Sequence, residues 1–441
     1  MSAPSDGSPG VSAPGQDITV VGGTYRERCV EPKIDAVRGS GLRAAALLTS
    51  LGNSTTFHTC IDRASKETGA ALFDAFGLRD VELADRPDPV TFRYDTPVSA
   101  ARWGFAGEID TIRVSAAWIV AFGMIDATWV VDGGLVVLDP QHGDLSALLA
   151  SVTAQSIAVV LNAHEATRLT GMPPIEAGTS LLDESGVEVV VVKQGALGGL
   201  VFTASGTDTY GPIPTPSIRT IGSGDAFTAG FAHAWFQDPA DPLAAAQMGA
   251  RVAAAHSLTD VPQVSPATLE ALPEPLSHPG EKQPTIYLAA PFFSTAERLL
   301  VEMVRDALLD AGLQVFSPLH DVGTGGDEVA AADLDGLTRS DAVLALLDAG
   351  DPGTVFETGW ATRADIPVVG FTEHPDAHEW TMLRGTGTPL SSDLTSAIHL
   401  AAWAAIRRVN CTKPTAPAVP TPRKDAGDSA ATTGAGSVAS S

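Results

Sequence analysis

Short, unbroken apolar runs that end in a small or polar residue recur along this chain and most limit how it can fold. The first part contains DITVVGG, AWIVAFG, GLVVLDP, IAVVLN and VEVVVVKQG, and the second TIYLAAP, LQVFSP, SDAVLALLD and IPVVGF. Ala/Leu-rich amphipathic stretches such as 294–312 separate them. Such runs suit parallel strands buried on both faces, with helices between them. Each part is therefore predicted to be an open α/β sheet, and polar residues just after the strands are the default candidates for chemistry.

The length of the chain, 441 residues, exceeds what one ordinary hydrophobic core supports. Residues 1–16 and 410–441 are rich in Ser, Pro, Gly and Ala and are predicted to be disordered. A proline-rich stretch without an apolar period predicts a linker over 261–283. The predicted domains are therefore 17–260 and 284–409.

Composition excludes several classes of function. With 27 basic and 52 acidic residues the formal charge is −25, which argues against nucleic acid or an anionic membrane as a general partner. Cys29, Cys60 and Cys411 are too few and too scattered for a disulfide framework or a zinc site. The N-terminus lacks the features of a secretory signal, and charges interrupt the apolar region 112–139, which favours two or three buried strands over a membrane span. We expect a soluble, cytoplasmic protein.

The stretch RTIGSGDAFTAGF (219–231) places small residues directly before Asp225 at the predicted start of a helix. Glycines permit a tight turn there, and the first amides of a helix together with its dipole attract anions. Asp225 beside such an anion site could take a proton from a hydroxyl while phosphate is transferred. The alternative is a Gly-rich loop whose aspartate caps the helix.

Two further motifs follow predicted strands of the first part. In LNAHEATRLTG, Asn162 and Glu165 could hold Mg²⁺, directly or through water, near phosphates. In VVVKQGALGGLVF, Lys193, Gly195 and Gly198 form a turn that could lie against a nucleotide. The alternative for the first motif is a helix cap with a surface ion pair.

Together these motifs resemble three successive motifs of the ribokinase or PfkB-like carbohydrate kinases, over roughly residues 17–260. The resemblance implies a ribokinase-like three-layer domain with a small β lid, and ATP and Mg²⁺ as cofactors. It implies that Asp225 is the general base on a hydroxymethyl group and that Asn162 and Glu165 serve the Mg²⁺-phosphate. It also implies that Gly222, Ser223 and Gly224 form an anion hole and that the stretch from Lys193 to Gly198 borders the ATP.

The first part departs from that family at three arginines. Arg219 occupies the usually acidic position six residues before Asp225. In RGSGLRAAALLTSLG, which looks like the family's sugar-binding G-G-x-x-x-N segment, Arg38 replaces the first glycine and Arg43 the asparagine. Gly39 and Arg43 are the candidate substrate-binding residues there, and a guanidinium suits a carboxylate or phosphate. DPVTFRYDTPVSAARWGF (88–105) is predicted to be the β lid, with an edge hairpin as the alternative.

Acidic residues follow strands of the second part at fixed spacings. Asp333 precedes Asp341 by eight residues, and Asp351 precedes Glu357 by six. Carboxylates at strand ends beside aromatic residues suit glycosyl transfer, in which one is the nucleophile and another the proton donor. Because the whole chain is acidic, solvated surface carboxylates are the alternative.

The segment from Thr285 to about Arg408 resembles the nucleoside 2-deoxyribosyltransferases, through IYLAAPFF, VFSPLHD, D-x7-D and D-x5-E followed by TGWA. The resemblance implies a smaller Rossmann- or flavodoxin-like parallel sheet and a covalent glycosyl intermediate on Glu357. Where the family has an asparagine for the sugar's hydroxymethyl end, this chain reads HEWTMLRG, with Trp380 and Thr381. The remaining roles that it implies are base contact or protonation by Asp333 and Asp351, orientation of Glu357 by Tyr287, and substrate binding by Phe292, Phe293 and Asp341.

The leading hypothesis is a bifunctional enzyme of nucleoside metabolism that exchanges or removes a base and phosphorylates a sugar or nucleoside hydroxymethyl group. One alternative makes the second domain an N-glycosidase of nucleoside 5′-monophosphates. Another makes the kinase-like domain a binding or regulatory module. The expected partners are small molecules, namely a deoxynucleoside, a nucleobase and a pentose, and the second family's shared sites imply a homo-oligomer.

Overall fold

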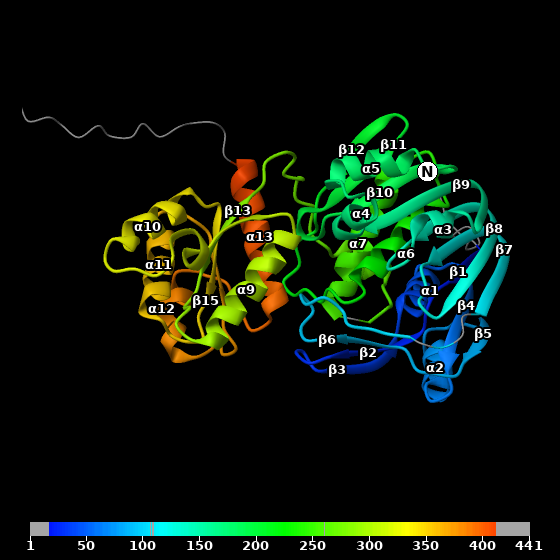
Figure 1. Cartoon of the computed structure of the whole chain (residues 1–441), viewed down its shortest axis with the longest axis horizontal. Coiled ribbons are helices and arrows are strands. Elements are labelled where there is room, and N and C mark those ends of the chain that lie inside the picture. Colours follow the sequence, from blue (N-terminus) through cyan, green and yellow to red (C-terminus); the bar gives the residue numbers. More distant parts are fainter. Residues whose placement is uncertain (1–16, 106, 108–109, 260, 412–441) are drawn as a thin grey trace, which may run out of the picture.

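The computed structural model describes residues 17–105, 107, 110–259 and 261–411. The stretch 1–16 and residues 412–441 of the predicted tail lie outside the described residues. Two α/β domains follow each other along the chain (Figure 1). The described part contains no helix that combines the length and the apolar character needed to cross a bilayer.

The strands and helices of the first domain alternate over most of its length, as the apolar runs predicted. The strands are β1 Asp17–Val21, β2 Tyr25–Cys29, β3 Ile34–Arg38, β4 Ser54–Asp62, β5 Asp80–Arg86, β6 Thr91–Tyr94, β7 Asp110–Phe122, β8 Ala127–Asp139, β9 Val152–Asn162, β10 Val187–Lys193, β11 Gly199–Thr203 and β12 Gly206–Tyr210. The helices are α1 Ser40–Ser50, α2 Lys66–Ala75, α3 Leu145–Leu149, α4 Ala163–Thr170, α5 Pro174–Leu182, the 3₁₀ turn η1 Gly195–Leu197, α6 Ser223–Trp235, α7 Pro242–Thr259 and α8 Pro266–Glu270.

Most of these strands form one sheet in the order β12-β11-β10-β9-β8-β7-β1-β4-β5. It is parallel from β5 to β10, and β11 and β12 are antiparallel additions. One face packs against α1, α6 and α7, and the other against α3, α4 and α5. The central strands are therefore buried on both sides, which is why they read as continuous apolar runs.

A separate three-stranded sheet in the order β3-β2-β6 stands beside this large sheet. Strand β6 lies inside the segment 88–105 that was predicted to be the lid, and it pairs in parallel with β2. Figure 1 shows the small sheet projecting from the body of the first domain. The prediction of a three-layer domain with a small β lid is confirmed.

The second domain contains β13 Thr285–Ala289, β14 Gln314–Phe316, β15 Ala342–Leu346, β16 Val368–Phe371 and β17 Leu390–Ser391. Its helices are α9 Thr295–Asp310, the π turn η2 Pro318–Val322, α10 Val329–Arg339, α11 Pro352–Arg363, the 3₁₀ turn η3 His378–Trp380, α12 Thr381–Gly385 and α13 Leu394–Cys411. The strand order β14-β13-β15-β16-β17 is parallel throughout. This 2-1-3-4-5 order is that of flavodoxin-like sheets, as predicted.

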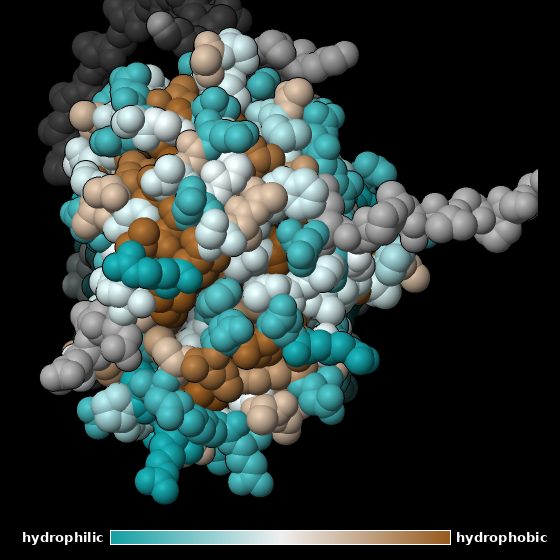
Figure 2. Space-filling model, turned by 90° about the vertical axis from the view of Figure 1, so that its right-hand side faces the viewer, coloured by the Kyte–Doolittle hydropathy of each residue, from teal (hydrophilic) through white to brown (hydrophobic). Residues whose placement is uncertain are grey.

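The segment 261–283, predicted to be a linker, packs against the first domain. It contains α8, and Val264 and Leu272 belong to the first domain's core cluster. The amide of Leu276 donates to the carbonyl of Pro212 at 2.9 Å. Residues 277–284 then lead from this contact into β13, so the second domain begins close to the first. Figure 2 shows the face of the first domain that points away from the second domain, where polar and apolar side chains are mixed.

Candidate active sites

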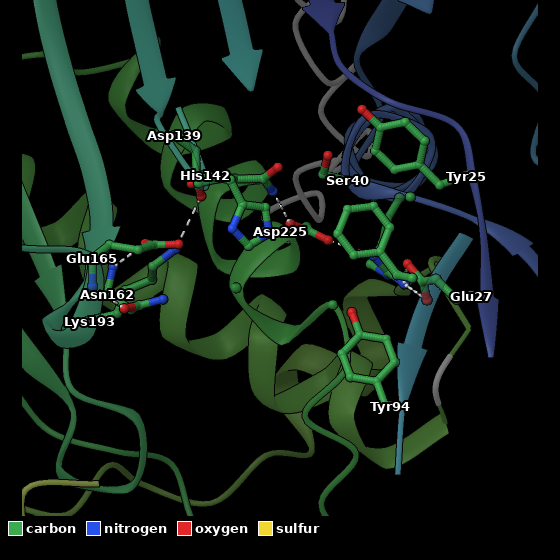
Figure 3. A pocket seen from close by; sticks show the side chains of 16 residues that line it. Tyr25, Glu27, Ser40, Tyr94, Asp139, His142, Asn162, Glu165, Lys193 and Asp225 are labelled. Atoms are coloured by element: carbon green, nitrogen blue, oxygen red, sulfur yellow. Dashed lines mark hydrogen bonds and ion pairs between the residues drawn. The ribbon is translucent and has the colours of Figure 1, made fainter. Parts of the chain in front are cut away.

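A cavity of about 210 Å³ lies between the small sheet, α1 and the start of α6 (Figure 3). In this view Asp225 lies between two groups of side chains, with Asn162, Glu165 and Lys193 on one side and Tyr25, Glu27 and Tyr94 on the other. We call this cavity the acceptor pocket. Its lining is Tyr25, Glu27, Gly39, Ser40, Arg43, Phe92, Tyr94, Asp139, Gln141, His142, Asn162, Glu165, Lys193, Gly222, Gly224 and Asp225.

Asp225 occupies the first turn of α6, directly after a turn at Gly222 with φ of 81°. Its Oδ2 accepts from Arg43 Nη1 at 2.5 Å and its Oδ1 from Gln141 Nε2 at 3.1 Å. Burial raises the pKa of Asp225 to about 6, against the lowering effect of Arg43. Asp225 is therefore an ionised carboxylate at pH 7 that lies closer to protonation than an ordinary aspartate, as suits a general base.

Arg43 reaches the acceptor pocket from α1 and is nearly fully buried. Its Nη2 donates to both carboxylate oxygens of Glu27, at 3.1 and 2.9 Å, while Nη1 serves Asp225. The guanidinium was expected to suit an anionic acceptor, but two carboxylates of the protein already neutralise it. Glu27 thus explains how an arginine is tolerated at this position.

The other two arginines that depart from the family motifs, Arg38 and Arg219, lie outside the acceptor pocket. Arg38 and Arg219 line a different cavity, between β3 and the turn before α6. The Nη1 of Arg219 donates to the carbonyl of Thr259 at 3.1 Å. Gly39, by contrast, lines the acceptor pocket with φ of 113°, where a Cβ would lie 2.5 Å from the carbonyl oxygen of Gly23.

Asn162 and Glu165 form a reciprocal capping box at the start of α4. Asn162 Oδ1 accepts from the amide of Glu165, and Glu165 Oε2 accepts from the amide of Asn162, both at 2.8 Å. The helix cap, which was the alternative interpretation of this motif, is therefore present. Burial, and next the charge of Asp139, raise the pKa of Glu165 to about 7.

Asp139 was missed by the sequence analysis. It ends β8, and its Oδ2 accepts from Lys193 Nζ at 3.1 Å and from the hydroxyl of Thr228 at 2.8 Å. Its Oδ1 is buried without a hydrogen-bond partner in the described structure. The signal was available in GLVVLDP, because a polar residue ending a buried run was the criterion that selected Asn162 and Lys193.

Aromatic rings on the lid side were also missed. Tyr25 and Phe92 lie 5.2 Å apart between ring centroids, and Phe92 stacks with His142 at 5.9 Å. Tyr94 lines the same wall. The hydroxyl of Tyr25 donates to Asp126 at 2.9 Å, which fixes its ring. Phe92 and Tyr94 lie in the segment 88–105, whose alternation and aromatic residues predicted the lid, although neither ring was singled out as a site residue.

A second cavity of about 350 Å³ continues from the acceptor pocket and shares Asn162, Lys193 and Gly224 with it. We call it the nucleotide pocket. Gly195 and Gly198, predicted to border a nucleotide, line it together with Ser223. The described structure therefore brings all three predicted motifs of the first part to two adjoining cavities.

The turn before α6 uses some of its donors internally. The amide and hydroxyl of Ser223 donate to the carbonyl of Thr220 at 3.0 and 2.9 Å. A Cβ added at Gly224 would lie 3.5 Å from Lys193 Nζ. The predicted anion hole thus has Gly224 and the Lys193 ammonium at the junction of the two cavities, while the donors of Ser223 stabilise the turn.

In the second domain, β13 and α11 place Tyr287 and Glu357 together. The hydroxyl of Tyr287 donates to Glu357 Oε1 at 2.6 Å, and its ring stacks on Phe316 at 5.5 Å between centroids. Burial raises the pKa of Glu357 to about 7, with smaller raising effects from Asp333 and Asp351 and a lowering effect from the Tyr287 hydrogen bond.

The predicted aspartates around Glu357 divide into different environments. Asp333 Oδ1 is buried and has no hydrogen-bond partner in the described structure, and burial raises the pKa of Asp333. Asp351 is the N-cap of α11, where Oδ2 accepts from the amide and hydroxyl of Thr354 at 2.7 and 3.0 Å. Both raise the pKa of Glu357, so both lie within electrostatic reach of it.

Asp341 is not brought to this site. It directly precedes β15, at the N-terminal ends of the parallel strands β13 and β15, whereas Glu357 lies in α11. Its Oδ2 accepts from the amide of Thr285 at 2.9 Å, which ties together the starts of β13 and β15. The D-x7-D spacing runs from within α10 to the residue before β15, and of its two aspartates Asp333 is the one within electrostatic reach of Glu357.

Phe292 and Phe293 follow β13 and stack at 5.4 Å between ring centroids. Phe292 is half-buried, whereas Phe293 is 70% exposed. At the position where the family has an asparagine, Trp380 is buried in the core and the Thr381 hydroxyl donates to the carbonyl of His378 at 2.5 Å. Neither residue replaces an asparagine that faces a ligand.

Family models match two separate stretches of the chain. Residues 132–261 match the pfkB family carbohydrate kinases, and residues 286–394 match the nucleoside 2-deoxyribosyltransferases. The matches are consistent with a fusion of these two kinds of domain, which confirms the resemblance stated from the motifs. The chain thus carries a kinase domain of the pfkB family and a nucleoside 2-deoxyribosyltransferase-like domain.

Individual relatives cover the kinase part. An ATP-dependent 6-phosphofructokinase isozyme 2 of Mycobacterium tuberculosis is 25% identical over 263 residues, covering 50% of this chain and 76% of that protein. A 1-phosphofructokinase of Rhodobacter capsulatus is 26% identical over 262 residues, covering 51% and 81%. A fructokinase structure from Vibrio cholerae O395, bound to fructose, ADP and calcium, has a TM-score of 0.48 and 16% identity, covering 59% and 100%.

Proposed function

We propose that the chain is a bifunctional enzyme of nucleoside metabolism. The first domain uses Mg-ATP to phosphorylate the hydroxymethyl group of a nucleoside or free pentose. The second transfers the 2-deoxyribosyl group of a deoxynucleoside through a covalent intermediate on Glu357. The observation that carries the proposal is that each domain holds a partly buried carboxylate of raised pKa, Asp225 and Glu357, at the site of its predicted motif.

In the kinase reaction, Asp225 accepts the proton of the acceptor hydroxyl. Since Arg43 holds Oδ2, the proton goes to Oδ1 once the acceptor displaces Gln141. The hydroxyl oxygen forms a bond to the γ-phosphorus of ATP while the bond to the β–γ bridging oxygen breaks, and ADP leaves. Lys193 and the first turn of α6 stabilise the charge that develops on the phosphoryl oxygens.

The residues present fit a magnesium ion. Glu165 uses only Oε2 in the capping box, and Asp139 Oδ1 is a buried oxygen without a partner among the described residues. Mg²⁺ prefers one or two carboxylates together with water and phosphate oxygens. We infer that Glu165 and Asp139 hold it, directly or through water, and Asn162 keeps the cap in place. The ion would neutralise phosphate charge.

The acceptor is inferred to be uncharged. Arg43 is neutralised by Glu27 and Asp225, so the acceptor pocket offers little to a sugar phosphate. Flat rings of Tyr25 and Phe92 suit a sugar or a nucleobase. Ser40 Oγ, buried and without a partner in the described structure, is available to a substrate hydroxyl. These features distinguish the site from one built for an anionic acceptor.

In the second domain, Glu357 attacks the anomeric carbon of the deoxyribosyl group as the bond to the nucleobase breaks. The departing base takes a proton from Asp333, whose pKa is raised by its half-buried position. An incoming base then attacks the same carbon, gives its proton to Asp333 and releases Glu357, or water does so and gives free deoxyribose. Tyr287 orients the nucleophile through its 2.6 Å hydrogen bond.

A non-catalytic kinase-like domain is the second candidate function, and the Arg43–Asp225 ion pair favours it. If Arg43 and Gln141 together keep both oxygens of Asp225 from an acceptor hydroxyl, the domain binds ATP or a nucleoside without turnover. Calorimetry that detects binding without ADP formation for any acceptor would support this candidate. Formation of ADP that depends on an acceptor would exclude it.

The deciding experiment is mass spectrometry of products after incubation with thymidine, adenine and Mg-ATP. We expect deoxyadenosine and a phosphorylated deoxynucleoside or deoxyribose.

Glu357→Ala is expected to abolish base exchange and to leave the kinase active. Asp225→Ala is expected to abolish the kinase and to leave base exchange intact. If neither substitution changes any product, the proposal is wrong. Thymine release without exchange would indicate a hydrolase, and release of a free base only with ATP would indicate an N-glycosidase of nucleoside monophosphates.

We further propose that the protein works in the cytoplasm and self-associates through its second domain. Each of its three cysteines is free, as suits a reducing compartment. Phe356 and Trp360, on the helix that carries Glu357, are 58% and 44% exposed with rings 6.0 Å apart. Exposed aromatic clusters are typical of interfaces. Light scattering with Phe356→Ser is the test.

A further inference from the structure

The nucleotide pocket is lined by both domains. Most of its wall belongs to the first domain, but His399 and Trp403 of α13 also line it. Figure 1 shows α13, in orange-red, between the sheet of the second domain and the first domain. A helix that lies outside the kinase domain therefore forms part of the cavity that the proposed function assigns to ATP.

Helix α13 is held in this position by contacts on two faces. Ala397, Ala401 and Ile406 belong to the core beneath the second sheet. On the other face, Ser396 Oγ accepts from the amide of Ile218 at 2.9 Å, and Trp403 Nε1 donates to the carbonyl of Ala196 at 3.1 Å. Residues 396, 399 and 403 follow each other by three and four positions, so they share one helix face.

The two ends of the nucleotide pocket differ in chemistry. The end shared with the acceptor pocket carries Asn162, Lys193 and Gly224, which suit phosphates. The remaining lining is largely apolar and includes Ile213, Ile218, Phe227, Ala250, Ala253 and Ala254. The flat, apolar faces of a purine base fit this second lining. Because α13 bonds to Ala196 and Ile218, its side chains lie at the base end.

His399 presents a hydrogen-bond acceptor at this end. Its Nδ1 donates to the carbonyl of Thr395 at 2.9 Å, and burial lowers the pKa of His399, so the ring is neutral at pH 7. With the proton on Nδ1, Nε2 carries a lone pair. No hydrogen bond to Nε2 is found among the described residues, and the ring stands edge-on to Trp403 at 5.8 Å.

We propose that α13 of the second domain completes the nucleotide pocket of the kinase, with Trp403 walling the base and His399 Nε2 accepting from the exocyclic amino group of adenine. This inference rests on the proposed kinase function. Guanine carries a carbonyl oxygen where adenine carries the amino group. A lone pair of that oxygen would face the lone pair of His399 Nε2, and the two would repel. The second domain thus sets the preference of the kinase for adenine nucleotides.

The test is calorimetric titration of the full-length protein with Mg-ADP and Mg-GDP. We expect the wild type to bind ADP more tightly than GDP, and His399→Ala to weaken ADP binding by about tenfold and to bring the two affinities together. His399→Gln keeps an acceptor oxygen and is expected to restore part of the preference. His378→Ala, on an exposed turn of the same domain, is the matched control and should bind as the wild type does.

Each outcome separates this inference from the proposed function. Wild-type affinity and preference in His399→Ala would overturn the inference alone, as would tighter ADP binding, which would make α13 a plug. The adenine preference could disappear with His399→Ala while the wild type phosphorylates no acceptor. That result would support the inference and overturn the proposed kinase function. Failure of the wild type to bind either nucleotide would overturn both. Thermal melting of each variant confirms that it is folded.

Discussion

Arg43 connects two carboxylates, Glu27 and Asp225, at the centre of the acceptor pocket. Two buried carboxylates this close would repel each other without a cation between them. The guanidinium has enough donors to serve both, which a lysine ammonium does not match in geometry. At the scale of single residues, this ion network accounts for the departure from the family motif.

Replacing Arg43 by Ala is expected to destabilise the first domain by about 3–5 kcal/mol, since it leaves two buried carboxylates without their partner. Urea unfolding measures the loss. Arg26→Ala is the control, because Arg26 pairs with Asp35 on the surface, with side chains 44% and 39% exposed, and solvent screens such a pair so that it contributes little to stability. Equal losses in the two variants would contradict the role given to Arg43.

Glu357 sets the pH dependence expected for base exchange. Its pKa is raised to about 7, and only the ionised carboxylate is a nucleophile, so the rate should fall as the pH drops below 7. Tyr287 donates to the ionised form and lowers the pKa of Glu357. Tyr287→Phe is therefore expected to move the acidic limb of the pH–rate profile up by about one unit.

The kinase supplies an internal control for that measurement. Asp225 has a pKa of about 6, so acceptor-dependent ADP formation should fall below pH 6 as its carboxylate becomes protonated. Tyr287→Phe lies in the other domain and should leave this second profile unchanged. A Tyr287→Phe profile for base exchange that coincides with the wild type would sink the role assigned to Tyr287.

At the scale of elements, the turn into α6 depends on one of its two glycines. Gly222 has φ of 81°, and a Cβ there would lie 2.0 Å from Arg43 Nε. Gly224 lies inside α6 without a positive φ, and its nearest neighbour would be Lys193 Nζ at 3.5 Å. The glycine-rich stretch therefore has one position that requires glycine for the fold and another that does not.

Gly222→Ala is expected to lower the free energy of unfolding by about 1–3 kcal/mol and to disturb Arg43. Gly224→Ala should keep the stability or raise it by up to about 1 kcal/mol, since alanine favours a helix. Chemical unfolding of both variants is the measurement. The reverse order of stabilities would contradict this account of the turn.

Helix α4 shows how far local reasoning reaches. The spacing of Asn162 and Glu165 predicted a magnesium site, with a helix cap as the alternative, and the structure contains the cap. The cap follows from the backbone of a single turn, so sequence suffices for it. The proposed magnesium role depends on Asp139, which ends another strand and comes near Glu165 through the pairing of β8 with β9.

At the scale of the whole molecule, the two domains share a hydrophobic cluster. Ala196, Leu197 and Ile218 of the first domain pack with Trp403 and the rest of α13. Such an interface couples the stability of the two domains, in contrast to domains joined by a flexible linker alone.

Trp403→Ala is expected to remove about 3–5 kcal/mol from this shared cluster, because the side chain is almost fully buried. In scanning calorimetry the unfolding transition should move to lower temperature and separate into two. Leu299→Ala, which truncates an exposed apolar side chain of α9 in the same domain, is the matched control. If both variants melt alike, the domains are not coupled through α13.

The sequence by itself determined the two parallel sheets, the helical starts and the residues at the ends of the strands. These depend on apolar periodicity and on turns, which act over a few neighbouring residues. Only the tertiary structure decided that Arg43 lies against Asp225, that Asp341 lies away from Glu357, and that His399 lines the nucleotide pocket. Such contacts join residues far apart in the chain, and side-chain packing between elements fixes them.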